Sequence, residues 1–160
     1  MNNLHKFLLP GVITLILVLS GTHAIAGDSP LNVNLESFLQ NELDNSLRKI
    51  DAETPVKPGE VIVYRATYRN LGPSTLSGIA ATLPVPTGTV AVLDIDSPVS
   101  PMASVNGRTF HSTPLVRTLP NTGEQEVIPA EEYVAMRWPV ASLPAGESFT
   151  AEIRVRVTEE

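Results

Sequence analysis

The segment Pro58–Ser74, with the sequence PGEVIVYRATYRNLGPS, decides the fold. Turn-forming residues bound it on both sides, Pro58-Gly59 at the start and Gly72-Pro73-Ser74 at the end. Between the turns, an apolar set and a mostly polar set alternate: Ile62, Tyr64, Ala66 and Tyr68 against Val63, Arg65, Thr67 and Arg69. A period of two is typical of a β-strand, here with one apolar face and one basic face. We therefore expect this segment to be the central strand of an antiparallel sandwich, with Arg65 and Arg69 exposed.

Similar alternation predicts further strands along the chain. Residues 149–157 alternate strictly, and an apolar side in residues 133–140 is formed by Val134, Met136, Trp138 and Val140. Shorter strands are expected at 76–83, at 89–95 (apolar enough to be buried on both sides) and at 115–118, with residues 120–130 as a polar loop. Asn106-Gly107 is the strongest hairpin signal. The fold class expected is all-β, an antiparallel β-sandwich of about seven or eight strands. Its core is expected to contain Tyr64, Ala66, Tyr68, Val134, Met136, Trp138, Ile153 and Val155.

The first 26 residues have the features of a secretory signal peptide. Residues 8–19 are an apolar run, and Ala24 and Ala26 are the small residues that a signal peptidase reads. Cleavage is therefore expected before Gly27. The alternative is an uncleaved anchor, but the apolar run is shorter than the roughly 20 residues of a membrane-spanning helix. We expect no stable membrane anchor after cleavage.

Composition limits what the remaining residues, 27–160, can be. They are numerous enough for one domain with a core of its own. The net charge of the whole chain is −6 at pH 7, and an acidic protein repels nucleic-acid phosphates, so no nucleic-acid partner is expected. The chain has 14 prolines, which argue against long helices. It has no cysteine, which excludes disulfides and a lipid-modified terminal cysteine.

Residues 31–50 fit two patterns. Helical spacing is kept by Leu35, Phe38, Leu39, Leu43, Leu47 and Ile50, with no proline or glycine between them. Strand spacing is kept by the odd-numbered apolar residues from Leu31 to Leu43, and Asp44-Asn45-Ser46 suits a hairpin turn. The residues alone leave both open and slightly favour a helix.

No catalytic constellation is evident. His111 is the one histidine after the expected cleavage point, and a serine–histidine–aspartate site would have to use Ser112 or Ser104 with Asp94 or Asp96. No nucleophile-elbow or oxyanion motif accompanies these residues, so a surface histidine is the preferred interpretation. We expect no enzymatic activity and no cofactor.

Two sites for ions were considered and not preferred. A lone histidine without cysteine argues against zinc or copper. Asp94-Ile95-Asp96 and Glu131-Glu132 could offer oxygen ligands to calcium, but they lack the glycine spacing and ligand density of calcium loops, so solvated carboxylates are preferred. No metal site is therefore expected.

Four arginines could form one basic stripe if their strands share a sheet: Arg65, Arg69, Arg154 and Arg156. Such a stripe could bind an anion or a glycan. The preferred alternative is an outward face, with Glu152 and Arg154 exposed, that is balanced across strands by Glu60 and Glu152.

Several short motifs follow one another in order between residues 56 and 157. They are VKPGE at 56–60, YRNLGPS at 68–74, LPVPTG at 83–88, the hairpin at 105–110, RW at 137–138 and LPAGES at 143–148. This order resembles the bacterial conserved-repeat domain of unknown function, number eleven, a family of Ig-like sandwiches in exported and cell-surface proteins. The resemblance implies an Ig-like fold, and it favours a first strand over a helix in residues 31–50.

The function expected is that of a non-catalytic structural or interaction module of the bacterial envelope or surface, periplasmic or extracellular. Its partner would be another envelope or surface protein, or a second copy. One alternative is a glycan-binding or enzyme-accessory module, but such platforms need exposed aromatic residues, and Tyr64, Tyr68 and Trp138 fall on faces expected to be buried. The other is a donor-strand fibre subunit, in which residues 31–43 pair with a neighbour. Pairing within the chain is preferred, because the turn at 44–46 is short.

Overall fold

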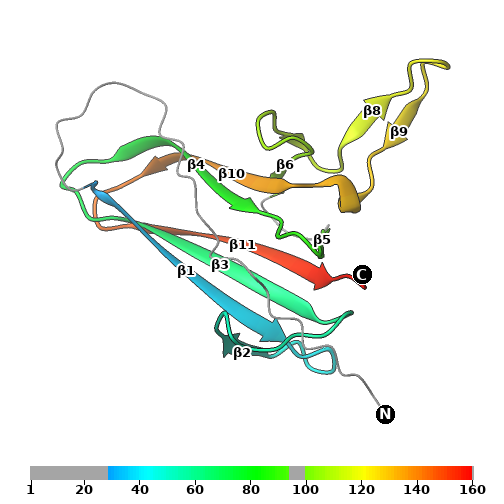
Figure 1. The fold of residues 1–160 in the computed structure, drawn as a ribbon. Coiled ribbons are helices and arrows are strands. Elements are labelled where there is room, and N and C mark those ends of the chain that lie inside the picture. Colours follow the sequence, from blue (N-terminus) through cyan, green and yellow to red (C-terminus); the bar gives the residue numbers. More distant parts are fainter. Residues whose placement is uncertain (1–28, 94–99, 160) are drawn as a thin grey trace, which may run out of the picture.

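The computed structural model describes residues 29–93 and 100–159. Two antiparallel sheets face each other across a common apolar core, as the sequence predicts for a β-sandwich (Figure 1). A separate two-stranded ribbon extends beyond them. The predicted signal peptide, residues 1–26, lies outside the described residues.

The larger sheet has five strands in the order β2-β1-β3-β11-β5. Their bounds are Leu47–Ile50 (β2), Leu31–Gln40 (β1), Val61–Asn70 (β3), Ser148–Val157 (β11) and Thr89–Val92 (β5). The strand predicted to be central is indeed flanked on both sides. It pairs with β1 from Leu31↔Asn70 to Gln40↔Val61, and with β11 up to Arg156↔Val61.

The smaller sheet has the order β4-β10-β6-β7. Its strands are Leu76–Pro84 (β4), Ala135–Leu143 (β10), Met102–Ser104 (β6) and His111–Ser112 (β7). The β6–β7 connection is the hairpin predicted at Asn106-Gly107. Its strands begin further from the turn than expected, because Asn106 hydrogen-bonds to Ser104, Arg108 and Thr109 within a longer loop.

The core lies between the two sheets and contains most of the residues predicted for it. Each of the following is at most 8% exposed: Ile62, Tyr64, Ala66, Tyr68, Met136, Trp138, Ile153 and Val155. Val134 was predicted to join them and does not, since it is 43% exposed. The reason is that β10 begins only at Ala135, so Val134 lies in the connection before the strand.

Residues 31–50 form a strand hairpin and not a helix. β1 pairs with β2 through the register Ser37↔Ile50 to Gln40↔Leu47, and Asn45 occupies the turn with a φ of 57°. β1 also pairs with β3 of the same chain along its whole length. This is the self-pairing that the sequence favoured.

Three expectations for the shorter elements were wrong. The strand expected at 89–95 ends at Val92 and lies at the edge of its sheet, so that only Ala91 is fully buried. The polar loop expected at 120–130 contains β9, Gln125–Val127, which pairs with β8, Val116–Thr118. The described strands number eleven, more than the seven or eight expected, because several are only two to four residues long.

One short 3₁₀ turn, η1 (Ala130–Glu132), leads from the ribbon into β10. Within residues 29–93 and 100–159, no helix has the length and apolar character needed to cross a membrane.

Candidate functional site

Of the residues considered for a catalytic triad, the structure describes three: His111, Ser112 and Ser104. His111 and Ser112 are exposed on β7. Ser104 is buried, and its Oγ accepts hydrogen bonds from the backbone N–H groups of Asn106 (3.2 Å) and Gly107 (2.8 Å). The Ser104 hydroxyl thus shapes the hairpin turn. Asp94 and Asp96 lie outside the described residues.

Two of the carboxylates considered for calcium, those of Glu131 and Glu132, lie on η1. Both carboxylate oxygens of Glu132 accept hydrogen bonds from Arg117 at 3.0 Å, so this carboxylate already has a partner within the protein. The part of the chain that the structure describes contains no cluster of three or more histidine, cysteine, aspartate or glutamate side chains that could hold a metal ion. The other proposed ligands, Asp94 and Asp96, are not described.

The arginine stripe exists in part and is neutralised on its own sheet. Arg65 and Arg154 both contact Glu152, at 2.7 Å and 3.0 Å, across and along β3 and β11. Arg65 also lies 5.0 Å from the centre of the Phe38 ring. Consequently Arg65, Glu152 and Arg154 are half-buried, although they were expected to be exposed, whereas Arg69 is exposed as predicted.

Glu60 does not balance the stripe as expected. Its carboxylate accepts a hydrogen bond from the Lys57 backbone N–H at 2.7 Å, while Arg156 donates to the Gly59 carbonyl at 2.8 Å. The outer face of β3 also contains Val63, which is fully buried beneath its neighbours. The outer face of β3 and β11 therefore contains both charged pairs and apolar side chains, and it is not a continuous cationic strip.

The larger aromatic side chains do not form a flat platform. Trp138, Tyr64, Tyr68 and Tyr133 are at most 8% exposed. Arg137 covers Phe110, with its guanidinium carbon 3.6 Å from the ring centre. Stacking of sugar rings requires exposed aromatic faces, which none of these residues supplies.

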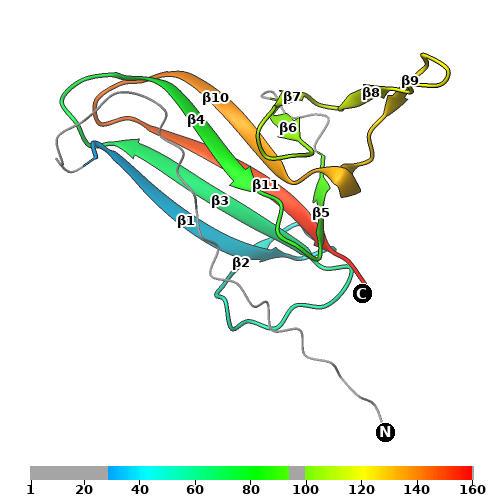
Figure 2. The ribbon, with the colours of Figure 1, turned by 45° about the horizontal axis from the view of Figure 1, so that its top comes forward.

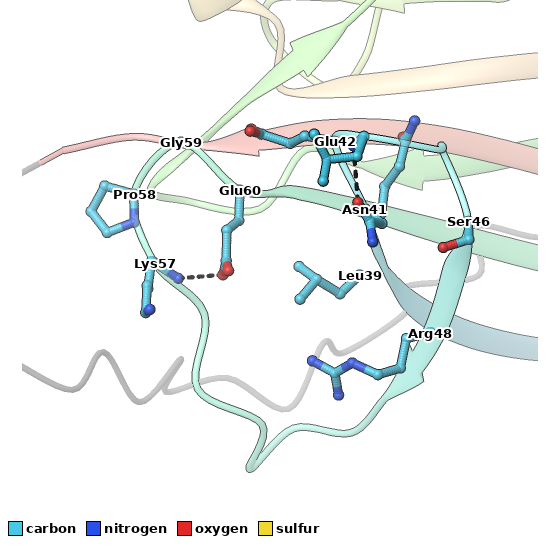
Figure 3. A pocket seen from close by; sticks show the side chains of 11 residues that line it. Leu39, Asn41, Glu42, Ser46, Arg48, Lys57, Pro58, Gly59 and Glu60 are labelled. Atoms are coloured by element: carbon cyan, nitrogen blue, oxygen red, sulfur yellow. Dashed lines mark hydrogen bonds between the residues drawn. The ribbon is translucent and has the colours of Figure 1, made fainter.

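A shallow hollow of about 640 Å³ lies between the β1–β2 hairpin and the loop at residues 57–60 (Figure 3). Leu39 lies centrally, with Arg48 and Lys57 on two sides of the opening. Leu43, on the hairpin turn, is 95% exposed. The hollow offers an apolar contact with charges around it, and it resembles a contact surface more than a reaction site.

The turn beside this hollow is held by local hydrogen bonds. Ser46 donates its backbone N–H to Asp44 at 3.0 Å, and this bond, with a further one from the Ser46 side chain, lowers the pKa of Asp44. In the connection to β3, the Thr54 hydroxyl bonds Asp51 at 2.7 Å and lowers the pKa of that carboxyl in the same way. Both carboxylates favour the turn most when they are ionised.

The most distinctive surface feature is the β8–β9 ribbon, called the arm below (residues 116–127). It extends away from the sandwich in both views (Figures 1 and 2). All six of its strand residues are exposed. Val116 and Val127 lie opposite each other and are 50% and 59% exposed.

The base of the arm is fixed to the sandwich. Leu115 is buried, and its backbone N–H donates to the Tyr133 hydroxyl at 2.8 Å. Ile128 donates its N–H to the Leu115 carbonyl, also at 2.8 Å. Arg117 pairs with Glu126 (2.9 Å) and Glu132 (3.0 Å), and these carboxylates raise its pKa. These contacts at the base fix the direction of the arm, while the residues of its two strands remain exposed to solvent.

The sequence predicted one of the two strands of the arm, β8. The strand at 115–118 was expected, but β9 was missed because Gln125-Glu126-Val127 has no apolar alternation. The turn signal at 121–123 between two short polar-rich segments was the available clue.

Comparison with protein-family models, with curated proteins and with solved structures finds no match for the chain. What the molecule itself defines is an all-β sandwich with a projecting two-stranded arm.

Proposed function

We propose that this protein is a non-catalytic, Ig-like interaction module of the bacterial cell envelope or surface, exported after removal of residues 1–26. The arm is the single observation that carries the proposal. An isolated two-stranded ribbon is marginally stable in water, and an exposed apolar pair on it gains free energy when it is covered. Val116 and Val127 form such a pair. A protein surface that packs on the arm would bury this apolar pair.

Other observations support the remaining parts of the proposal. Export is supported by the composition of residues 1–26, and an Ig-like module by the sandwich together with the order of motifs in residues 56–157. The strand order differs from that of immunoglobulin constant domains, because the last strand, β11, lies next to β3. The likeness is one of architecture, which many surface domains share without an identical topology.

The two alternatives have less support. Glycan binding lacks an exposed aromatic platform among the residues that the structure describes. A donor-strand role for residues 31–43 would require β1 to leave β3, with which it pairs over ten residues.

Localisation is tested by expressing the full chain in a bacterium, separating its compartments and measuring the intact mass. We expect material that begins at Gly27 in the periplasmic or extracellular fraction. Full-length chain held in the inner membrane would contradict export.

The role of the arm is tested with a photo-crosslinking residue placed at Val116 or Val127 in the same cells. The matched control places it at Ser77, an exposed position on β4. We expect discrete adducts from both arm positions and not from Ser77. Equal adducts from all three positions, or none from the arm, would contradict an arm-mediated contact.

A further inference from the structure

The arm has an open backbone edge along β9, which pairs only with β8. In an antiparallel pair, positions that exchange backbone hydrogen bonds alternate with positions that do not. The backbone N–H of Ile128 donates to the Leu115 carbonyl at 2.8 Å, so this position faces β8. Glu126, two residues earlier, faces β8 in the same way. The backbone groups of Gln125 and Val127 therefore point away from β8, toward the open edge.

The larger sheet has an open edge of the same kind along β2, its outermost strand. The backbone N–H of Asn41 donates to the Ser46 carbonyl at 2.8 Å, at the start of the β1–β2 ladder. Arg48, two residues after Ser46, accordingly turns its backbone groups toward β1. The backbone groups of Leu47 and Lys49 point outward.

The two edges match each other in one antiparallel register. Placing Glu126 opposite Arg48 brings the outward backbone groups of both strands into pairing positions. Glu126 and Arg48 then form a pair without backbone bonds, the type of position at which side chains on neighbouring strands approach most closely. A shift of two residues in either direction would halve the number of paired positions and separate the two charges.

The side chains on both faces suit this register. Among the described residues, Arg48 has no hydrogen-bond or ion-pair partner, and it is exposed. Glu126 binds Arg117 of its own arm through Oε2 at 2.9 Å, and its Oε1 can accept a bond from Arg48 of a second molecule. On the opposite face, Val127 (59% exposed) lies against Leu47 (38% exposed), and covering both removes apolar surface from water.

The other open edges match less well. β4, β5 and β7 form the remaining edges of the two sheets, and none of these strands contains a lysine or an arginine. The opposite edge of the arm, along β8, would place Arg117 against Arg48, and like charges that face each other across strands are destabilising. Charge therefore selects β9 as the edge that approaches β2.

We propose that β9 of one molecule adds to β2 of a second copy, so that the arm continues the larger sheet of its neighbour. The proposal rests on the proposed function and deepens it, because it names a second copy as the partner of the arm. The two-stranded arm gains a third strand, and β2 no longer has an open edge. Since the arm and β2 are different surfaces, the contact is head-to-tail, and each pair of molecules keeps one free arm and one free β2.

Charge reversal tests this contact by sedimentation velocity on the purified protein over a range of concentrations. We expect the unaltered protein to self-associate. Arg48→Glu and Glu126→Lys each bring two like charges together, and each should weaken self-association at least about tenfold. An equimolar mixture of the two variants places opposite charges together again and should restore association. Arg108→Glu, the same change at an exposed position of the β6–β7 loop, is the matched control and should associate like the unaltered protein.

Disulfide formation tests the register without altering any charge. The chain has no cysteine, so Leu47→Cys and Val127→Cys each introduce one thiol at an exposed position. Because a disulfide requires the two residues to lie close together, a mixture of these variants should give at least about five times more covalent dimer on mild oxidation than Leu47→Cys mixed with Ser77→Cys. Ser77 is exposed on β4, away from the proposed contact.

A protein that stays monomeric at every concentration would overturn the proposal, as would reversal variants that associate normally or equal disulfide yields from the two mixtures. A reversal mixture that stays dissociated would also overturn it. Photo-crosslinking in cells separates this outcome from a failure of the proposed function. Adducts between the arm and a different protein, without self-association of the purified chain, would rule out the second copy and leave the arm as a contact surface.

Discussion

A single buried amide, that of Asn70, joins the two sheets at one corner of the sandwich. Its Nδ2 donates to the carbonyls of Ser74 (2.8 Å) and Leu143 (2.9 Å), and its Oδ1 accepts the Gly72 N–H at 2.9 Å. The residue is fully buried. Leu143 ends β10 in the smaller sheet, whereas Asn70 ends β3 in the larger one. The amide therefore fixes the turn from β3 toward β4 and, through its bond to Leu143, connects the two sheets.

Replacing this amide should be costly. We expect Asn70→Ala to lower the free energy of unfolding by about 3 kcal/mol, because it removes three hydrogen bonds, among them the buried one to the Leu143 carbonyl. Urea unfolding measures the change. The matched control is Asn106→Ala, an exposed turn amide that should cost about 1 kcal/mol or less. Equal losses for the two variants would show that the buried corner has no special role.

Trp138 is the largest side chain of the core and allows a second test at this scale. We expect Trp138→Ala to lower the free energy of unfolding by about 3–5 kcal/mol, the range for emptying a large aromatic site. Val134→Ala, on the same strand pattern but 43% exposed, should cost no more than about 0.5 kcal/mol. A loss below about 1 kcal/mol for Trp138→Ala in chemical denaturation would mean that the indole does not support the core.

Among the elements, β1 is the one whose role the sequence left open. Deleting residues 31–43 removes one of the two neighbours of β3 and exposes its backbone groups. We expect an unfolded or badly destabilised chain at every concentration, measured by circular dichroism and sedimentation. A folded, soluble monomer that regains partners when the peptide 31–43 is added would instead support donor-strand assembly.

The elements also show what sequence patterns can predict. The long strands β3 and β11 were predicted because alternation over residues 62–69 and 149–157 defines both a strand and its faces. Strands of two to four residues, such as β7 and β9, carry too few residues for a period, and β9 has no buried side. The prediction that Val134 is buried was wrong for a related reason, since alternation does not show where a strand begins.

The candidate surfaces were less predictable than the fold. The hollow needs Leu39 and Arg48 beside Lys57, and this proximity depends on the β1–β2 hairpin meeting a loop before β3. The balance of Arg65 by Glu152 was predicted, because the two residues occupy facing positions in neighbouring strands. The arm was half predicted, and its direction away from the sandwich depends on buried contacts of Leu115 and Tyr133.

At the scale of the whole molecule, two buried phenols link stability to pH. Burial raises the pKa of Tyr64 and of Tyr68 above the usual value of about 10, and in Tyr68 a backbone hydrogen bond from Thr82 partly opposes this. The folded protein therefore holds these protons more tightly than the unfolded chain does. Their contribution to stability is complete below about pH 10 and decreases as the pH rises through the folded-state values.

We accordingly expect the urea midpoint to fall as the pH rises above about 10, together with the appearance of phenolate absorbance. Tyr64→Phe should reduce this alkaline loss, because phenylalanine fills most of the same volume and does not ionise. A midpoint that stays constant above about pH 10, or that falls equally in Tyr64→Phe, would contradict the assignment.

The position of Trp138 has an optical consequence. It is the sole tryptophan of the chain and is only 7% exposed, on a strand of the smaller sheet that faces the larger one. Its emission spectrum therefore reports the polarity of the space between the sheets, without a label and without interference from a second indole. Separation of the sheets admits water and shifts the emission to longer wavelength, while changes confined to the distant arm leave the spectrum as it is. The protein thus contains its own probe of whether the sandwich is closed.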